Sequence, residues 1–294
     1  MKRVLITGLH SYVGNFIAAR MAEEPEKYRV DKISLRDDSW KSVDFSIYDS
    51  VFHVAGIAHV STAPDMESLY MRVNRDLAIE VGEKAKRDGV KQLIFTSSSI
   101  VYGDSVPDKD ALAIDLNTPL APANFYGESK VQAEGGLRAL ENDEFSVTVL
   151  RCPMMYGPGC VRGNFPTLAR AARKLPVFPD LPNRRSVLYV GNLAELVCGL
   201  VDRGMGGTFL PQNSEYMGTS QVVALMAEAA GRRILLTRFF NAPLRLMMRR
   251  VEMARKAFGS LFYDQACSDV GFEYRRYTLR DSIREIAESD GWSK

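Results

Sequence analysis

The chain has 294 residues, of which 46% are hydrophobic and 25% charged, an ordinary composition for a protein with a folded core. Its 38 Lys and Arg residues and 36 Asp and Glu residues leave a net charge of only +2, so no basic field is available to hold a nucleic-acid backbone. No apolar run reaches the roughly 18 residues of a membrane-spanning helix, and the first residues lack the apolar stretch of about 7–15 residues found in a secretory signal. We therefore expect a cytoplasmic protein without a nucleic-acid or membrane partner.

The cysteines and histidines indicate neither a metal centre nor a disulfide framework. Cys152, Cys160, Cys198 and Cys267 form no C-x-x-C pair, and no histidine stands near them at a ligand spacing. Nothing beside Cys152 or Cys160 marks either thiol as a nucleophile. We expect no metal ion.

Strands and helices alternate through the first half of the chain. Short apolar runs predict strands at residues 4–6, 30–35, 51–56, 93–95 and 147–150. Apolar residues at helical spacing predict helices at 13–21, 66–88 and 124–140, while 36–53 leaves little room for another. This alternation predicts an α/β protein with a doubly wound parallel sheet covered by helices on both faces.

The pattern changes after residue 151. Residues 152–186 contain many prolines and glycines, which predicts ordered loops around a ligand. A helix at 192–201, a sixth strand at 207–210 and a helix at 219–230, capped by Thr219 and Ser220, are expected next. Residues 244–258 predict one amphipathic helix with a solvated basic face; a membrane-surface or partner helix is the alternative for this segment.

A turn with small residues joins the first expected strand to the first helix. The motif Gly8-x-x-Ser11-x-x-Gly14 lets backbone N–H groups and the helix N-terminus face a diphosphate. Ser11 stands where the usual pattern has its middle glycine, and a plain strand-to-helix turn is the alternative. We expect a dinucleotide cofactor to be bound by Gly8, Ser11, Tyr12, Val13 and Gly14.

The residues after the second strand bear on the choice between NAD and NADP. The adenosine ribose is read about 20 residues past the phosphate loop, where this chain has Arg36. A guanidinium offers a bidentate fork to a 2′-phosphate, which favours NADP. Asp37 and Asp38 follow directly, and a carboxylate there would bind the ribose 2′-hydroxyl of NAD, so both cofactors stay open.

Tyr126 and Lys130 form a candidate catalytic pair. They are four residues apart on an expected helix and so share one face. A phenol with a pKa of roughly 10 is a poor base at neutral pH, but a nearby ammonium favours the phenolate. Tyr126 is therefore a candidate acid–base, and Lys130 could also hold the nicotinamide ribose. A surface pair on an amphipathic helix is the alternative interpretation.

A run of hydroxyl side chains ends the fourth expected strand. Ser97, Ser98 and Ser99 lie where ligands of parallel sheets bind, at the carboxyl end of a strand. Ser98 could bond a substrate hydroxyl or ketone, and a polar strand end with a local cap is the alternative.

Several motifs occur in one order along the chain: the glycine turn of 8–14, His53-Val54-Ala55-Gly56, Val73-Asn74, residues 96–103, Tyr126-x-x-x-Lys130 and residues 150–159. In this order the sequence resembles the extended short-chain dehydrogenase/reductases, and among them the nucleotide-sugar epimerases and 4-ketoreductases of the UDP-glucose and UDP-GlcNAc 4-epimerase type. The resemblance runs through most of the chain. It implies a Rossmann-like NAD(P)-binding domain of 1–150 and 187–217, interleaved with a smaller nucleotide-sugar-binding domain of 151–186 and 218–294.

The resemblance also implies residue roles. Tyr126 would be the acid–base, Lys130 its modulator and Ser98 the catalytic hydroxyl, with Ser99 beside it at the substrate. The remaining roles are cofactor contacts by Ala55, Gly56 and Asn74, and substrate-diphosphate contacts by Asn164 and Arg185. Alternatives are a buried amide bonding the backbone at position 74, a helix N-cap at 164 and a solvated charge at 185.

Three features refine the resemblance. The Asp-Glu pair that the family's 4,6-dehydratases carry after the catalytic hydroxyl is replaced here by Ser99-Ile100, which argues against dehydration. The short stretch before residue 53 leaves the adenine contact to Asp44 and Phe45 in a loop. His59 is interpreted as shaping a loop rather than as catalytic.

The expected reaction is hydride transfer between nicotinamide C4 and a sugar ring carbon, C4′, of a UDP-linked sugar. It would end either in epimerisation or in reduction of a 4-keto sugar. By resemblance alone we expect a homodimer formed through the helices at 66–88 and 124–141. The alternative from another class is an NAD(P)-binding sensor or scaffold protein without turnover.

Overall fold

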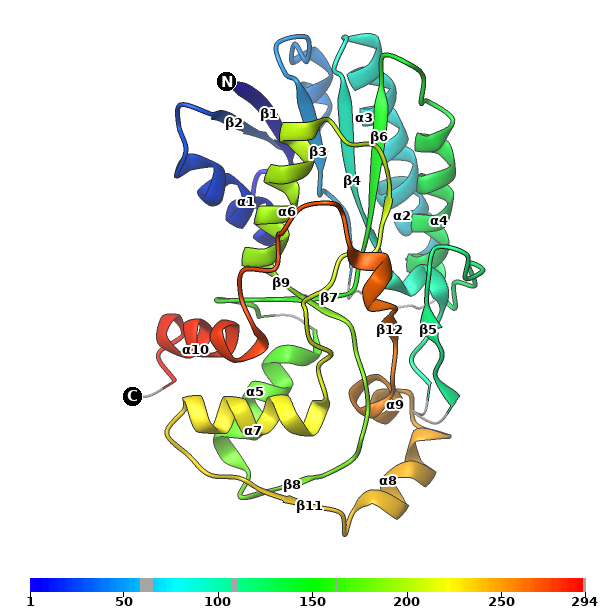
Figure 1. The fold of residues 1–294 in the computed structure, drawn as a ribbon. Helices are drawn as coiled ribbons and strands as arrows, with labels where there is room; N and C mark the ends of the chain where they lie inside the picture. Colours follow the sequence, from blue (N-terminus) through cyan, green and yellow to red (C-terminus); the bar gives the residue numbers. More distant parts are fainter. Residues whose placement is uncertain (59–65, 107–109, 162, 293–294) are drawn as a thin grey trace.

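A computed structural model describes residues 1–294 apart from 59–65, 107–109, 162 and 293–294, so His59 lies outside the described residues. Its centre is a parallel sheet in the order β10-β6-β4-β3-β1-β2 (Figure 1). The strands are β1 (Lys2–Thr7), β2 (Tyr28–Ile33), β3 (Ser50–His53), β4 (Gln92–Ser98), β6 (Ser146–Cys152) and β10 (Gly207–Phe209). The expected α/β class and parallel sheet are confirmed.

Alternation along the strands produces one core on each face of the sheet. Val4 and Ile6 of β1 face α1 (Tyr12–Ala22) and α6 (Val190–Arg203), whereas Leu5 faces the opposite core. That second core is closed by α3 (Leu77–Arg87) and α4 (Phe125–Arg138). Figure 1 shows the two pairs of helices on opposite sides of the sheet. The near-continuous apolar runs of the sequence reflect burial on both faces.

The helix expected at 66–88 is divided into three parts. It begins as α2 (Glu67–Tyr70), widens into a π-helical segment over Met71–Asp76 and continues as α3. Such wide turns are rare and occur often at functional sites. Here the wide turn carries the buried Asn74. Between β2 and β3 the chain forms only a 3₁₀ helix, Asp38–Ser42, as the short spacing predicts.

The second half adds a lobe at one end of the sheet (Figure 1). β7 (Met154–Tyr156) follows directly from β6 and pairs with β9 (Val187–Tyr189). β8 (Val177–Pro179) pairs with β11 (Leu235–Thr237), and β5 (Ala113–Ile114) pairs with β12 (Phe262–Tyr263). A separate core lies among α5 (Asn164–Lys174), α7 (Thr219–Ala229) and α10 (Leu279–Ser289).

Two local predictions in this lobe are wrong. The segment 244–258 forms two helices, α8 (Asn241–Met248) and α9 (Glu252–Phe258), because Val251 between them has extended backbone angles. Both helices then pack on one small core that includes Leu244, Met248 and Ala254. Thr219 and Ser220 do not cap α7: Gly218 holds the cap position, and the Ser220 hydroxyl donates to the Pro179 carbonyl instead.

Candidate active site

The carboxyl ends of β1, β3 and β4 bring the predicted motifs to one edge of the sheet. Thr7 and His53 are register partners there, and the Thr7 hydroxyl lies 2.9 Å from the His53 Nδ1 atom. His53 is fully enclosed, and its Nε2 atom has no hydrogen-bond partner among the described residues. Burial, together with the charge of Lys130, lowers the pKa of His53 to about 3, so the imidazole is neutral.

Two positions of the turn between β1 and α1 favour glycine. Gly8 has a φ of 92°, in the region that favours glycine. A Cβ at Gly14 would lie 3.0 Å from the Ile6 side chain and 3.3 Å from the Val54 side chain, so these neighbours would have to shift to admit a larger residue. This close approach forms the cradle that a dinucleotide diphosphate needs at a helix N-terminus.

The side chains of Ser11, Tyr12 and Val13, which were also predicted to bind the cofactor, make contacts within the protein. Ser11 caps α1 by accepting a hydrogen bond from the Gly14 amide at 3.2 Å. The Tyr12 hydroxyl donates to the Pro158 carbonyl at 3.0 Å and so ties the turn to the second lobe. Val13 packs into the core. Any contact that Val13 makes with a cofactor therefore comes from its backbone.

The end of β2 is followed by an exposed arginine and by two carboxylates that already bond other residues of the chain. Asp37 accepts a hydrogen bond from the Ser39 amide at 3.0 Å and caps the 3₁₀ helix, while Asp38 pairs with Lys41 at 2.9 Å. Arg36 is exposed and makes no ion pair within the part of the chain that the structure describes.

Asp44 and Phe45 differ in what they can offer a ligand. Asp44 is exposed, and hydrogen bonds from Ser46 hold the pKa of its carboxyl below the usual range. Phe45 is fully buried, with the Lys84 ammonium 4.7 Å from its ring centroid. The Phe45 ring belongs to the core beneath α3, so an adenine contact at this residue would come from its backbone. The expected contact by Asp44 and Phe45 stays a prediction.

Asn74 positions the loop that follows β3. Its Oδ1 atom accepts from the Ile57 amide at 2.8 Å, and its Nδ2 atom donates to the Ile57 carbonyl at 3.0 Å and to the Ser129 hydroxyl at 3.2 Å. A Cβ at Gly56 would lie 3.0 Å from the same Oδ1 atom. Asn74 thus acts through the loop of Ala55 and Gly56, as the buried-amide alternative describes.

Tyr126 and Lys130 lie beside the end of β4, as their spacing predicts. Tyr126 lies in the first turn of α4, and the Ser98 side chain, which also caps the short 3₁₀ helix after β4, lies near it. Burial raises the pKa of Tyr126 to about 12, and the Ser98 hydroxyl opposes that shift. The phenol is therefore protonated at neutral pH.

Lys130 does not lower the pKa of Tyr126 in the manner the sequence suggests. Its Nζ atom donates to the Thr96 carbonyl at 2.8 Å and lies 4.6 Å from the Phe95 ring centroid. Burial lowers the pKa of Lys130 to about 8. A Cβ at Gly56 would lie 3.7 Å from Nζ, so the ammonium lies beside the loop expected to follow the cofactor.

A buried network beneath this pair was not predicted. The Glu134 carboxylate accepts hydrogen bonds from the Arg151 Nη2 atom at 2.7 Å and from the Ser97 hydroxyl at 2.5 Å. The Arg151 Nη1 atom donates a hydrogen bond to the Tyr102 hydroxyl at 2.7 Å. Glu134 is four residues after Lys130, so the same helical face continues from the catalytic pair to this anchor. This four-residue spacing is the feature of the sequence that could have indicated the buried network.

The two remaining substrate candidates meet in the second lobe. The Asn164 Nδ2 atom and the Arg185 Nη1 atom both donate to the Lys256 carbonyl, at 3.0 Å and 2.8 Å. Asn164 is not an N-cap, because Gly163 holds that position. Burial lowers the pKa of Arg185 to about 10, and no carboxylate among the described residues pairs with it. Ser99 lies near Tyr263, whose hydroxyl donates to the Arg151 carbonyl at 2.6 Å.

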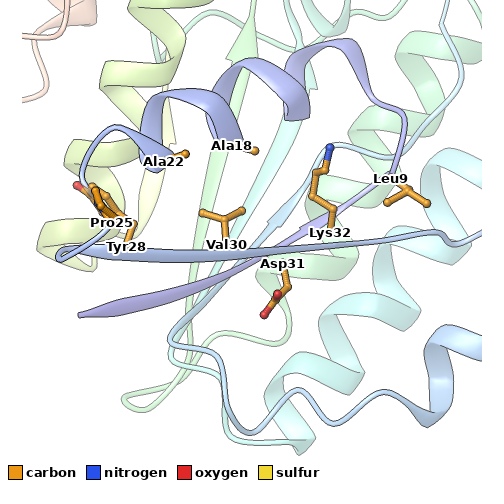
Figure 2. A pocket seen from close by; sticks show the side chains of 8 residues that line it. All are labelled: Leu9, Ala18, Ala22, Pro25, Tyr28, Val30, Asp31 and Lys32. Carbon is orange, nitrogen blue, oxygen red and sulfur yellow. The ribbon is translucent and has the colours of Figure 1, made fainter.

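A separate hollow of about 450 Å³ lies between α1 and the edge strand β2 (Figure 2). It is bordered by Leu9, Ala18 and Lys32 among others, and Lys32 donates to the Asn15 side chain at 2.7 Å. No candidate catalytic residue borders it.

The described part of the chain has no group of three His, Cys, Asp or Glu side chains placed for a metal ion. It also has no helix long and apolar enough to cross a bilayer.

A parallel sheet with a glycine cradle, and with Tyr126 and the buried Lys130 on one helical face beside the end of β4, defines a nucleotide-cofactor oxidoreductase of the Rossmann class. The model of the NAD dependent epimerase/dehydratase family matches residues 4–209, and the chain belongs to that family. The expected family and its NAD(P) cofactor class are thereby confirmed.

Individual relatives agree with this assignment. The chain is 30% identical to a Vibrio cholerae UDP-glucose 4-epimerase, over 99% of this chain and 90% of the relative. It is 35% identical to an Escherichia coli O157:H7 N-acetyl-alpha-D-glucosaminyl-diphospho-ditrans,octacis-undecaprenol 4-epimerase, over 51% of this chain and 44% of the relative. The solved structure of RMD from Pseudomonas aeruginosa complexed with NADPH has the same fold, with a TM-score of 0.78, 20% identity and full coverage of both chains.

Proposed function

We propose that the protein is a sugar 4-epimerase or 4-ketoreductase that acts on a nucleoside diphosphate sugar, with UDP as the favoured nucleotide. The position of Tyr126 carries this proposal: it lies one helical turn before the buried Lys130, whose Nζ atom donates to the Thr96 carbonyl of β4 at 2.8 Å. When bound, NAD(P) would supply the nicotinamide ring that exchanges a hydride with a sugar carbon. The cradle around Gly8 and Gly14 and the loop at Gly56 would hold it.

Tyr126 moves the proton that accompanies the hydride. Because its pKa is raised to about 12, the resting phenol is a proton donor to the oxygen of a keto sugar. In the opposite direction the phenolate accepts the hydroxyl proton, and the nearby Ser98 hydroxyl, which lowers the pKa of Tyr126, favours that charged form. Lys130, with a pKa near 8, is mostly charged at neutral pH and favours the phenolate when it turns from the Thr96 carbonyl.

Arg185 and Asn164 are proposed to bind the sugar's diphosphate. A partly buried guanidinium that pairs with no carboxylate among the described residues favours an incoming anion, and its fork geometry suits phosphate oxygens. Both side chains now donate to the Lys256 carbonyl, so this carbonyl holds them in place until an anion arrives.

The state of the residues after β2 favours NADP over NAD. Asp37 and Asp38 are already bound by Ser39 and Lys41, while the Arg36 guanidinium is exposed. A 2′-phosphate would therefore meet an available cation and no competing carboxylate. NADPH use would in turn favour the reductase outcome over epimerisation.

A second candidate function is the same reaction on a sugar that is attached to a polyprenyl diphosphate instead of UDP. The E. coli relative is described as an epimerase of a sugar on undecaprenyl diphosphate, and a diphosphate is common to both carriers. An assay with the same sugar on UDP and on a polyprenyl diphosphate decides between them.

Tyr126→Phe tests the proposed chemistry. We expect turnover of UDP-GlcNAc, UDP-glucose and a 4-keto derivative to fall about 10²–10⁴-fold, with cofactor binding retained, because the proton donor is gone. The matched control is Tyr28→Phe, whose hydroxyl bonds Asp202 away from the site and which should keep activity. Undiminished turnover in Tyr126→Phe would refute the mechanism. Cofactor binding without turnover of any sugar in the wild type would favour a sensor.

A further inference from the structure

α8 lies at the end of the second lobe far from the sheet (Figure 1), and several large apolar side chains in and around it are exposed. Phe239 is 82% exposed, Leu246 61% and Met247 46%. We call this the α8 surface; its apolar members are Leu235, Phe239, Phe240, Leu246, Met247 and Val251. The Phe239 and Phe240 rings contact each other, with centroids 5.3 Å apart, immediately before the helix begins.

The apolar side chains of this surface are not required by the protein's own core. On α8 the inward face consists of Leu244 and Met248, which pack with Leu181 and Ala254. Leu246 and Met247 point away from that cluster and are exposed. A helix on a water-facing surface ordinarily keeps its outer face polar. Apolar residues on both faces indicate that the outer face has a partner.

The charge around the α8 surface identifies the chemistry of that partner. Residues 232–256 include eight Lys and Arg residues and a single acidic residue, a net charge of +7 in a chain whose total is +2. The rest of the chain is therefore acidic, with a net charge of −5. Arg245, Arg249 and Arg250 are exposed and make no ion pair with any carboxylate that the structure describes.

We propose that the α8 surface docks on an anionic lipid bilayer. Exposed aromatic and aliphatic side chains flanked by arginines match the interface of such a bilayer, where the apolar groups enter the headgroup region and the cations meet lipid phosphates. A second copy of the chain is the less favourable occupant, because two surfaces that both carry an excess of arginines repel each other. No spanning helix is needed, so the sequence argument against a membrane partner does not apply to surface contact.

Docking would place the candidate substrate site beside the bilayer. The Lys256 carbonyl that receives Arg185 and Asn164 belongs to α9, which packs with α8 on the same small core. The docking proposal does not rest on the proposed enzymatic reaction, since it follows from exposure and charge alone.

Flotation of the full-length protein with vesicles tests the proposal. We expect binding to phosphatidylglycerol-containing vesicles, little binding to pure phosphatidylcholine, and release by high salt. Each basic residue near an anionic surface contributes roughly fivefold, so Arg245→Gln, Arg249→Gln and Arg250→Gln together should lower partitioning about 100-fold. Phe239→Ser with Leu246→Ser should weaken it independently of charge.

The matched control neutralises three other exposed arginines, Arg29, Arg170 and Arg284, with the same substitutions. It should bind vesicles nearly as well as the wild type, and thermal melting checks that every variant is folded. Absence of vesicle binding, equal binding to neutral vesicles, or an equal loss in the control would overturn the proposal. A wild-type dimer that Phe239→Ser dissociates, without vesicle binding, would assign the surface to a second copy instead.

Discussion

The ion pair between Glu134 and Arg151 anchors α4 to the sheet, and Glu134→Gln tests how much the fold depends on it. The two side chains are 7% and 11% exposed and are joined by Nη2 to Oε2 at 2.7 Å and by Nε to both carboxylate oxygens at 3.1 and 3.2 Å. Glutamine keeps the shape but leaves the guanidinium charge without its carboxylate. Removing one partner of a buried pair costs about 3–5 kcal/mol, and we expect about 3 kcal/mol because the Tyr102 hydroxyl remains as an acceptor.

Denaturant unfolding measures this loss. The midpoint in urea should fall while the slope of unfolding free energy against urea stays unchanged, since the same surface is exposed. The control is Glu228→Gln, which breaks a 2.7 Å pair with Arg280 on the surface and should cost less than about 1 kcal/mol. A cost for Glu134→Gln no greater than for this control would refute the anchoring argument.

Two further predictions concern His53 and Arg36. The folded His53 has a pKa of about 3 against an ordinary value of 6.5, so its contribution to stability is present above pH 6.5 and is lost as the pH falls toward 3. Between pH 7 and 5 the wild type should lose about 2 kcal/mol more unfolding free energy than His53→Asn, measured by urea titration at each pH; parallel losses would contradict the reasoning. Arg36→Ala should weaken NADPH binding about 10-fold or more in calorimetry and leave NADH binding nearly unchanged, because only NADPH offers a phosphate to the guanidinium. Equal losses for both cofactors would show that Arg36 reads no 2′-phosphate.

The parallel sheet could be predicted because its strands are buried on both faces. Such burial produces short, nearly continuous apolar runs, and each was followed by a helical spacing or a turn signal. The division of 244–258 could not be found in this way. α8 and α9 have the same kind of apolar spacing, and the break depends on extended backbone at Val251, whose cause is packing on the small core around Leu181.

The sequence indicated which side chains belong to the candidate site, but not their hydrogen-bond partners, their burial or their pKa values. Helical spacing correctly places Tyr126 and Lys130 on one face of α4. Burial raises the pKa of Tyr126, and the Lys130 ammonium does not counter that rise because it donates to the Thr96 carbonyl, a backbone atom of another element. Likewise, Phe45 is an aromatic residue in a loop by sequence, and only the tertiary fold shows that its ring is enclosed.

One face of α4 joins the stability of the protein to its proposed chemistry. Tyr126, Lys130 and Glu134 succeed one another at intervals of four residues, so their side chains descend along one line of the helix. Tyr126 lies near Ser98 at the sheet edge, Lys130 donates to the β4 backbone and Glu134 is fixed by Arg151 from β6. A shift of the anchored end would therefore move the phenol relative to Ser98. This coupling explains why a buried charge pair, costly to desolvate, is placed directly beneath groups that must keep a fixed geometry.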